Sequence, residues 1–209
     1  MESEQPKQFM NVAGTPILMH TLKAFYDYHQ AIELIVVLPS EYMETWMDLC
    51  EQHHFKIPHK MVVGGSSRFE SSRNGLNVIK GEGLVAIHDA ARPLVSVDVI
   101  ARSFDTAEKK GNGIASVSLK DSIREVSEKF NRNVNRDSYC IIQTPQTFQI
   151  SLIKKAFESA DSSKVYTDDA SVLEDIGEEV VLSKGSYENI KVTTPVDLLT
   201  ANAILNSRK

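Results

Sequence analysis

The sequence has little cysteine and no long run of apolar residues. Its two cysteines, Cys50 and Cys140, lie far apart and form no Cys-X-X-Cys pair. This spacing argues against a disulfide framework or a structural zinc site and favours reduced thiols in the cytoplasm. The apolar runs are of strand length, well short of the roughly 20 residues that a membrane-spanning helix needs. Because residues 1–5 are polar and acidic rather than typical of a signal peptide, we expect a soluble cytoplasmic protein without a membrane partner.

Basic residues are also scarce. The chain has 23 Lys and Arg against 28 Asp and Glu, which gives a formal net charge of -5. Proteins that bind nucleic acid usually have a basic surplus, so we expect no nucleic-acid partner. A locally basic pocket for a small anion is still compatible with an acidic chain. The sequence also has no P-loop, no HExxH and no G-x-S-x-G motif, which excludes the chemistry that these motifs support.

Short apolar segments alternate with segments of helical periodicity. A length of 209 residues with 42% hydrophobic residues suits one domain with a sizeable core, here taken as 1–209. Alternation of this kind predicts βαβ units and a mostly parallel sheet with helices on both faces. We expect strands at 34–38, 60–63, 84–88, 113–119, 139–143 and 180–182. We expect helices at 15–28, 41–53, 69–79, 96–109, from 151, at 169–176 and after 195.

The alternation breaks at residues 120–137. This stretch is charged, contains several asparagines, and has only isolated apolar residues such as Ile123 and Val126. A solvated loop is one interpretation of the pattern. A β-hairpin arm that reaches toward a partner subunit is the other, and the residues alone leave both open.

Three polar segments follow expected strands, where α/β sheets bind their ligands. They are Gly64-Gly65-Ser66-Ser67-Arg68, Asp89 to Pro93, and Thr144-Pro145-Gln146. The first combines a flexible backbone with hydroxyls and a guanidinium at an expected helix start. Amides point outward there and can hold a phosphate or the edge of a base. A plain Gly-Gly turn with a serine cap is the alternative.

The segment His88-Asp89-Ala90-Ala91-Arg92-Pro93 places opposite charges at the end of an expected buried strand. Leaving such charges unpaired there would be costly. A functional interpretation has Asp89 near a metal or a sugar hydroxyl and Arg92 near a phosphate. The structural alternative is an Asp89–Arg92 ion pair that braces the turn.

Two lysines are further candidates, Lys7 near the start of the chain and Lys191 near its end. Lys191 lies between apolar neighbours at an expected strand end, from which it can point to the other face of the sheet. A merely exposed lysine is the alternative. The segments around Thr144 and Thr167 resemble turn or helix-cap chemistry when each is taken alone.

Taken together and in this order, six segments resemble the 2-C-methyl-D-erythritol 4-phosphate cytidylyltransferases of the non-mevalonate isoprenoid pathway. The resemblance runs through essentially the whole chain. The segments are Pro6-Lys7-Gln8-Phe9, Gly64-Gly65 through Arg68 and Ser71, His88 to Pro93, Thr144-Pro145-Gln146, Thr167 to Ser171, and Asn189 to Thr193. The resemblance implies a Rossmann-like fold and a homodimer whose hairpin arms embrace. It also implies that CTP and a sugar-alcohol phosphate react to give CDP-methylerythritol and pyrophosphate.

The resemblance assigns roles to individual residues. Lys7 and Lys191 are implied to be catalytic, since their charges would stabilise the α-phosphate. Mg²⁺ is implied to bind mainly through the CTP phosphates, with Asp89 as its protein ligand. The nucleotide-binding residues implied are Gly64, Gly65, Arg68, Ser71 and Asp89. The substrate-binding residues implied are Asp89, Ala90, Arg92, Ser122, Arg136, Thr144 and Thr167, with Arg136 and Ser122 reaching in from the neighbouring subunit.

The resemblance also predicts a gap at the start. Members of this family begin with a strand and a glycine-rich loop, just upstream of the segment that Pro6 to Phe9 matches. The first central strand and the triphosphate loop are therefore expected to be missing from these 209 residues. A sheet without its central strand leaves backbone groups unpaired and opens the core. If these 209 residues are the complete chain, we therefore expect poor folding or weak activity.

Three other functions compete with this interpretation. Ribitol 5-phosphate cytidylyltransferase is the nearest, since the same nucleotide-binding residues would serve either acceptor; the intact segment from His88 to Pro93 favours methylerythritol phosphate. A nucleotide-binding protein with impaired catalysis is the second. A dinucleotide-dependent oxidoreductase is the third, although the sequence has no GxGxxG.

Overall fold

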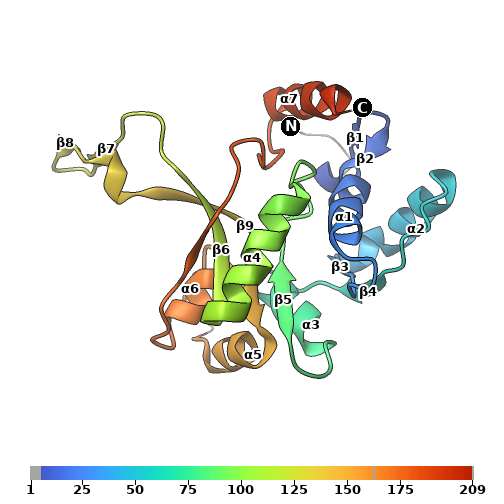
Figure 1. Ribbon diagram of the computed structural model, residues 1–209, viewed down its shortest axis with the longest axis horizontal. Helices are drawn as coiled ribbons and strands as arrows, with labels where there is room; N and C mark the ends of the chain where they lie inside the picture. The colour runs from blue at the N-terminus through green and yellow to red at the C-terminus, as the bar shows by residue number, and fades with distance from the viewer. Residues whose placement is uncertain (1–5, 162, 209) are drawn as a thin grey trace.

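Helices pack around a central β-sheet in the computed structural model, which describes residues 6–161 and 163–208 (Figure 1). The chain is therefore a mixed α/β protein. Its helices are α1 (Ile17–Tyr28), α2 (Met43–Gln52), α3 (Arg68–Asn77), α4 (Val97–Lys110), α5 (Ile150–Ser159), α6 (Asp169–Glu174) and α7 (Pro195–Ser207). Its strands are β1 (Asn11–Val12), β2 (Thr15–Pro16), β3 (Ile35–Leu38), β4 (Lys60–Val63), β5 (Leu84–Ile87), β6 (Asn112–Ser118), β7 (Arg124–Val126), β8 (Asn131–Asn133), β9 (Cys140–Gln149) and β10 (Leu182–Lys184). Short 3-10 helices cover η1 (Lys7–Phe9), η2 (Ser40–Tyr42) and η3 (Arg136–Ser138).

The main sheet has four strands in the order β10-β6-β9-β5. β10 is parallel to β6, whereas β9 is antiparallel to both β6 and β5. Three strands thus run one way and β9 runs against them. Only the β10–β6 pair of this sheet is therefore parallel, so its pairing does not meet the prediction of a mostly parallel sheet. β9 runs antiparallel to β6 because the chain enters it directly from the arm that follows β6. No crossover helix separates these two strands, and an antiparallel pair needs none.

Two expected strand boundaries were wrong. β9 was expected to end at residue 143, before a turn at Thr144-Pro145-Gln146, but it continues through this segment to Gln149. Proline lacks an N–H and usually ends a strand, yet it is tolerated where a ladder is irregular. The β6–β9 register shifts between Ile114 and Ser116, opposite this segment. The last strand of the sheet lies two residues later than expected, at Leu182–Lys184.

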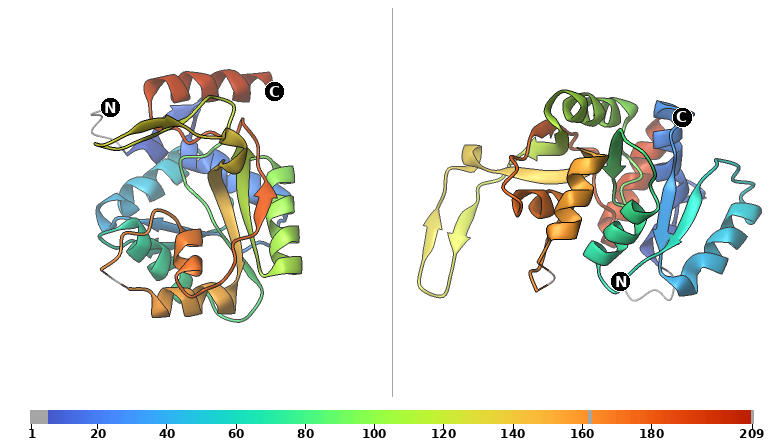
Figure 2. Two further views of the ribbon diagram at one scale, coloured as in Figure 1. Left: turned by 90° about the vertical axis from the view of Figure 1, so that its left-hand side faces the viewer. Right: turned by 90° about the horizontal axis from the view of Figure 1, so that it is seen from below.

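The arm at residues 120–137 contains a hairpin, the second of the two interpretations of this stretch. β7 and β8 pair antiparallel, with Arg124 opposite Asn133. The Arg132 guanidinium also donates to Glu125 across the pair. The hairpin projects well away from the central sheet in Figure 1 and in the right-hand view of Figure 2, and its Val126 side chain is 70% exposed.

The core lies mainly where α1, α2 and α4 pack beside the strands. Phe9, in the first described turn, stacks on the fully buried Trp46 of α2 with ring centroids 5.9 Å apart. On α4, the buried Ser103 hydroxyl bonds the Thr147 hydroxyl at 2.6 Å and so fixes the helix to β9. In the part of the chain that the structure describes, no helix combines the length and apolar character needed to cross a membrane.

An apolar cavity of about 520 Å³ lies between β3 and β5. β3 pairs with β4 and β5 pairs with β9, so one edge of each strand is unpaired among the residues described. Both strands line the cavity along their whole length. Because β3 and β5 do not pair, the β3–β4 pair lies beside α1 and α2, apart from the main sheet (Figure 2).

His88 anchors the turn that follows β5. Its Nδ1 lies 3.0 Å from the Thr144 hydroxyl, whose oxygen also accepts the Asp89 N–H at 3.0 Å. Its Nε2 lies 3.4 Å from the Arg92 carbonyl, and the Phe25 ring packs edge-on against the imidazole. These contacts suit a neutral ring that accepts at Nδ1 and donates at Nε2. Burial lowers the pKa of His88 to about 4, although the Asp89 charge opposes the shift.

Folding is therefore expected to become less favourable in acid. The pKa of His88 is lower in the folded protein than its usual 6.5, so only the unfolded chain binds a proton between these values. The contribution of His88 to the free energy of unfolding is fully present above about pH 6.5. It is lost as the pH falls toward 4, and the loss is at most about 3 kcal/mol. Urea unfolding of the wild type and of His88→Gln at about pH 7 and about pH 4.5 measures this loss of stability. If both proteins lose the same free energy of unfolding between the two pH values, His88 is not its source.

Candidate active site

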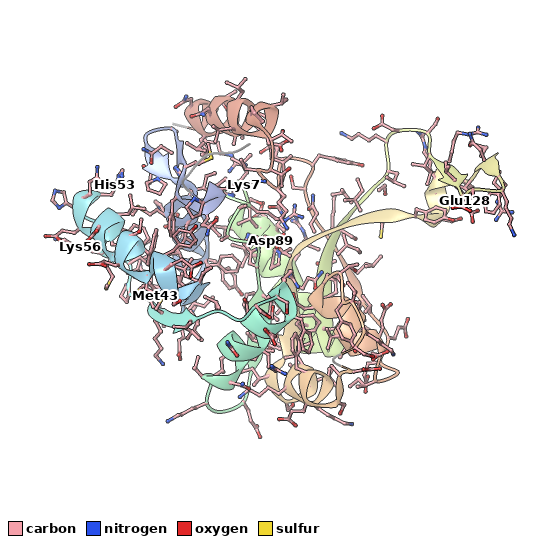
Figure 3. The ribbon with its side chains drawn as sticks, turned by 180° about the vertical axis from the view of Figure 1, so that it is seen from behind. Lys7, Met43, His53, Lys56, Asp89 and Glu128 are labelled. Atoms are coloured by element: carbon pink, nitrogen blue, oxygen red, sulfur yellow. The ribbon has the colours of Figure 1, made fainter. Side chains whose placement is uncertain are left out.

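Three segments that lie far apart in the sequence meet beyond the end of β5. They are the turn that carries Asp89 and Arg92, the stretch around Lys191 before α7, and the start of α3. The Val192 N–H donates to the Ala91 carbonyl at 2.8 Å, which fastens the second segment to the first. Figure 3 shows Asp89 near the middle of the molecule, where these elements converge.

Asp89 is the charge on which the site centres. Its Oδ2 lies 3.1 Å from Arg92 Nε and 3.2 Å from Lys191 Nζ, and its Oδ1 lies 4.0 Å from Arg68 Nε. The side chain is 13% exposed. Burial by itself raises the pKa of the Asp89 carboxyl, but the Lys191 and Arg92 charges outweigh it and hold this pKa below its usual value. The group is therefore a carboxylate at neutral pH.

Arg92 is engaged within the protein. Its Nε donates to Asp89, and its Nη1 donates to the Asn189 carbonyl at 2.7 Å. Its backbone N–H also donates to the Asp89 carbonyl at 3.1 Å, which closes the turn. The ion pair that braces the turn is thus present. It does not exclude a ligand role, since a guanidinium has five N–H donors.

Lys191 does not lie in a strand, contrary to the expectation, because residues 185–194 run without pairing in a ladder. Its side chain is 45% exposed, and its ammonium nevertheless pairs with Asp89. Lys191 is exposed, as the alternative held, but it also has a partner within the site. Lys191 combines a fixed counter-charge with access from solvent, as a group that meets an anionic ligand requires.

The start of α3 is built around two glycines. The Gly64 N–H donates to the Leu38 carbonyl at the end of β3, and the Gly65 N–H donates to the Ser71 hydroxyl at 3.1 Å. A Cβ on Gly65 would lie 2.2 Å from Glu70 Cβ, so only glycine fits there. The Ser67 hydroxyl accepts the Glu70 N–H at 3.1 Å and caps the helix. The serine cap considered as an alternative is therefore present.

Glu70 is a residue of this segment that the sequence analysis did not single out. The Ser66 N–H and hydroxyl both donate to its Oε2, at 2.7 and 2.6 Å. These two bonds lower the pKa of Glu70. The sequence signal for this contact was the spacing of Ser66 and Glu70, which lie four residues apart at the start of a helix.

Asp169 and Gln146 hold Arg68 in place; both lie in segments that the sequence analysis named, but neither was given a role of its own. Arg68 Nη2 donates to Asp169 Oδ2 at 2.5 Å, and the Asp169 side chain is only 1% exposed. Gln146, buried in β9, accepts the N–H groups of Asp169 and Ala170 at 3.1 and 2.9 Å. Its amide donates to Asp168 Oδ2 at 2.9 Å. Arg68 and Asp169 lie 101 residues apart in the sequence, so no local pattern predicts that they pair.

The other expected site residues on this side differ in accessibility. Thr144 is 4% exposed within β9, and its hydroxyl is taken by His88 and Asp89. Thr167 is exposed, just before Asp168, which caps α6. Ala90 is half-buried, and its carbonyl accepts the Thr21 hydroxyl at 2.9 Å.

Lys7, Ser122 and Arg136 are not joined to Asp89 by any hydrogen bond or ion pair within the described chain. Lys7 is exposed in η1, and Figure 3 shows it near Asp89 in that view. Ser122 and Arg136 belong to the arm, where the Arg136 guanidinium bonds the Lys120 carbonyl. The arm points away, with Glu128 far to the side of Asp89 in Figure 3.

The structure offers little for a metal ion held by protein alone. Within residues 6–161 and 163–208, no three His, Cys, Asp or Glu side chains lie close enough together to hold one. Asp89 Oδ2 is already neutralised by two cations, whereas Oδ1 has only the long approach of Arg68. One carboxylate oxygen suits Mg²⁺ that arrives on ligand phosphates, because this ion keeps most of its ligands from elsewhere.

Several bacterial proteins are similar to this chain in sequence and shape. A 2-C-methyl-D-erythritol 4-phosphate cytidylyltransferase of Bacteroides fragilis is 44% identical over 205 residues, 98% of this chain and 93% of the relative. The crystal structure of the enzyme so named from Thermus thermophilus superposes with a TM-score of 0.84 at 30% identity, covering 96% of this chain and 94% of that one. The crystal structure of the enzyme of the same name from Francisella tularensis superposes with a TM-score of 0.80 at 32% identity, covering 96% of this chain and 93% of that one.

A family model agrees with these relatives. It is described as 2-C-methyl-D-erythritol 4-phosphate cytidylyltransferase and matches residues 1–207, nearly the whole chain. The site residues found above lie inside the matched range, in the order in which the resemblance placed them. The chain belongs to the 2-C-methyl-D-erythritol 4-phosphate cytidylyltransferase family.

Proposed function

We propose that this chain, acting as a single nucleotidyltransferase domain over 1–209, transfers a cytidylyl group from CTP to 2-C-methyl-D-erythritol 4-phosphate. The products are CDP-methylerythritol, a precursor in isoprenoid synthesis, and pyrophosphate. The observation that carries the proposal is the Asp89 carboxylate, held among Lys191, Arg92 and Arg68 where three family segments meet. The free thiols of Cys50 and Cys140 support a cytoplasmic location, which cell fractionation checks.

The chemical step is a displacement at phosphorus. A phosphate oxygen of the acceptor attacks the α-phosphorus of CTP, and the bond to the bridging oxygen of the β-phosphate breaks, so that pyrophosphate leaves. Negative charge accumulates on the α-phosphate oxygens, and fixed cations lower the barrier most. Lys191 and Lys7 take this role, since both are exposed lysines on different segments. Positioning the acceptor in line supplies the rest, and no covalent enzyme intermediate is needed.

The start of α3 receives the nucleotide in this proposal. Glu70 and Ser71 pack closely against Gly64 and Gly65 and fix this turn, and the Ser71 hydroxyl holds the Gly65 N–H, so the edge of the base would be read by the backbone of a rigid turn. Arg68 and Asp89 lie at the inner end of this segment, where a ribose hydroxyl or the phosphates would follow. Asp89 would be the protein ligand of a Mg²⁺ ion that arrives with the triphosphate, and such an ion would supply positive charge near the leaving pyrophosphate.

The acceptor binds on the opposite side of Asp89, against Ala90, Arg92, Thr144 and Thr167. A second subunit completes this side in the proposal, which requires a homodimer formed through the arm. A long two-stranded hairpin with an exposed apolar side chain, Val126, gains stability from such a partner. Ser122 and Arg136 of one chain then reach the acceptor phosphate in the other. Sedimentation of a monomer at assay concentrations would overturn this part of the proposal.

A Rossmann-like sheet with a further strand between β3 and β5 is also part of the proposal. Both strands have an unpaired edge among the described residues, and both line the apolar cavity between them. Backbone donors and acceptors at such edges need partners, and an extended apolar segment supplies them. A strand there would join the β3–β4 pair to the main sheet.

Adding a strand is therefore expected to stabilise the protein. A short run of alternating Val and Ile, joined ahead of Met1 by a Gly/Ser linker, should raise the melting temperature by about 5 °C or more. The linker alone is the control. Val37→Asp, which places a charge on the cavity wall, should abolish the gain. Equal melting temperatures with and without the added strand would contradict the proposal.

The acceptor is tested by pyrophosphate release from CTP with each candidate. We expect a higher kcat/KM with methylerythritol phosphate than with ribitol 5-phosphate. The reverse preference would show a ribitol 5-phosphate cytidylyltransferase instead. Calorimetric binding of CTP without release of pyrophosphate from either acceptor would show a nucleotide-binding protein with impaired catalysis.

Removing the Lys191 ammonium should impair turnover more than binding. We expect Lys191→Ala to lower kcat by about 100-fold or more while the affinity for CTP changes by less than about threefold, since the ammonium acts most on the transition state. Lys184→Ala removes another exposed lysine, on β10, and should leave both constants unchanged. Unchanged turnover of Lys191→Ala would remove this residue from the mechanism.

A further inference from the structure

Arg68 lies between two carboxylates that hold it unequally. Its Nη2 bonds Asp169 Oδ2 at 2.5 Å, whereas its Nε stays 4.0 Å from Asp89 Oδ1. The first is a direct charge-assisted bond and the second lies at the outer limit of an ion pair. The position of Arg68 is therefore set by Asp169.

Asp169 is well placed to hold its partner still. Its side chain is 1% exposed, and it occupies the first turn of α6, whose positive end favours a carboxylate. Its N–H donates to the buried Gln146, which also bonds Asp168. Because this helix start is fixed to β9, Asp169 does not follow Arg68 when the guanidinium moves.

The two oxygens of Asp89 consequently differ. Oδ2 receives Arg92 and Lys191 at 3.1 and 3.2 Å. Oδ1 accepts no hydrogen bond within the described residues, and it is not among their buried polar atoms that lack a partner. It is thus an accessible carboxylate oxygen at the point where the three segments meet.

We infer that Asp169 is a positioning residue that restrains Arg68 and so keeps Asp89 Oδ1 open for CTP and its divalent cation. A guanidinium offers five donors in a planar fork and readily grips both oxygens of a carboxylate. Released from Asp169, Arg68 closes the short gap to Oδ1 and blocks it. The inference rests on the proposed function only in naming CTP as the ligand.

The Asp169→Asn variant tests this restraint. It keeps the shape of the side chain but removes its charge, so Arg68 should move onto Asp89. We expect the affinity for CTP with Mg²⁺, measured by calorimetry, to fall by about tenfold or more. Asp175→Asn is the matched control, since it makes the same change just after the end of α6 and breaks an exposed pair with Lys164. It should leave the affinity unchanged.

A double variant separates positioning from mere structural support. In Asp169→Asn with Arg68→Gln the Arg68 guanidinium is no longer present to close onto Asp89 Oδ1, while Arg92 and Lys191 stay on Oδ2. We therefore expect the double variant to bind CTP with Mg²⁺ more tightly than Asp169→Asn alone. A purely structural role predicts the opposite, because a second substitution in the same contact then adds damage or changes nothing. Melting temperatures confirm that each variant is folded.

The binding measurements test the role of Asp169 without depending on catalysis. Tighter binding by the double variant supports it, and binding as weak as or weaker than that of Asp169→Asn overturns it. Unchanged affinity in Asp169→Asn also overturns it. If the wild type binds CTP but releases no pyrophosphate with methylerythritol phosphate, the proposed function fails while the binding comparison still stands.

Discussion

The site depends on the cost of removing the Asp89 carboxylate from water. A charge that is only 13% exposed is tolerated when opposite charges and hydrogen bonds replace the lost solvation. Arg92 supplies them from the same turn, Lys191 from a segment about 100 residues later, and Arg68 from the start of α3. Electrostatic compensation therefore requires these three parts of the chain to meet. The same convergence concentrates cations where a polyphosphate would bind.

β9 gives this convergence its rigidity. Three buried polar side chains of this strand each fix a different loop. Thr144 bonds the Asp89 turn, Gln146 holds the start of α6, and Gln143 donates to the Ser186 carbonyl at 2.8 Å. Buried polar groups that are fully bonded specify one arrangement. A strand that was expected to end before this segment is thus the element that aligns the site, and the β6–β9 register shift accommodates Pro145 within it.

Local signals in the sequence were sufficient for most elements and for the central pair of charges. β4 lies where its apolar run predicted it, and the Asp89–Arg92 pair needs only a turn of three residues. What escaped prediction depends on contacts distant in sequence. The partner of Arg68 is 101 residues away, and the path of β9 through Pro145 is decided by its neighbours β5 and β6. Propensity and spacing carry no information about either.

The division of the sheet links its architecture to the geometry of the site. The Gly64–Gly65 segment follows β4 and is bonded to the end of β3, so the β3–β4 pair sets its position. Asp89 follows β5, so the main sheet sets its position. The cavity between β3 and β5 therefore separates the two halves of the site. Across it, Arg68 reaches from α3 to Asp169 and toward Asp89. Whatever fills that cavity consequently sets how far the glycine segment stands from the carboxylate.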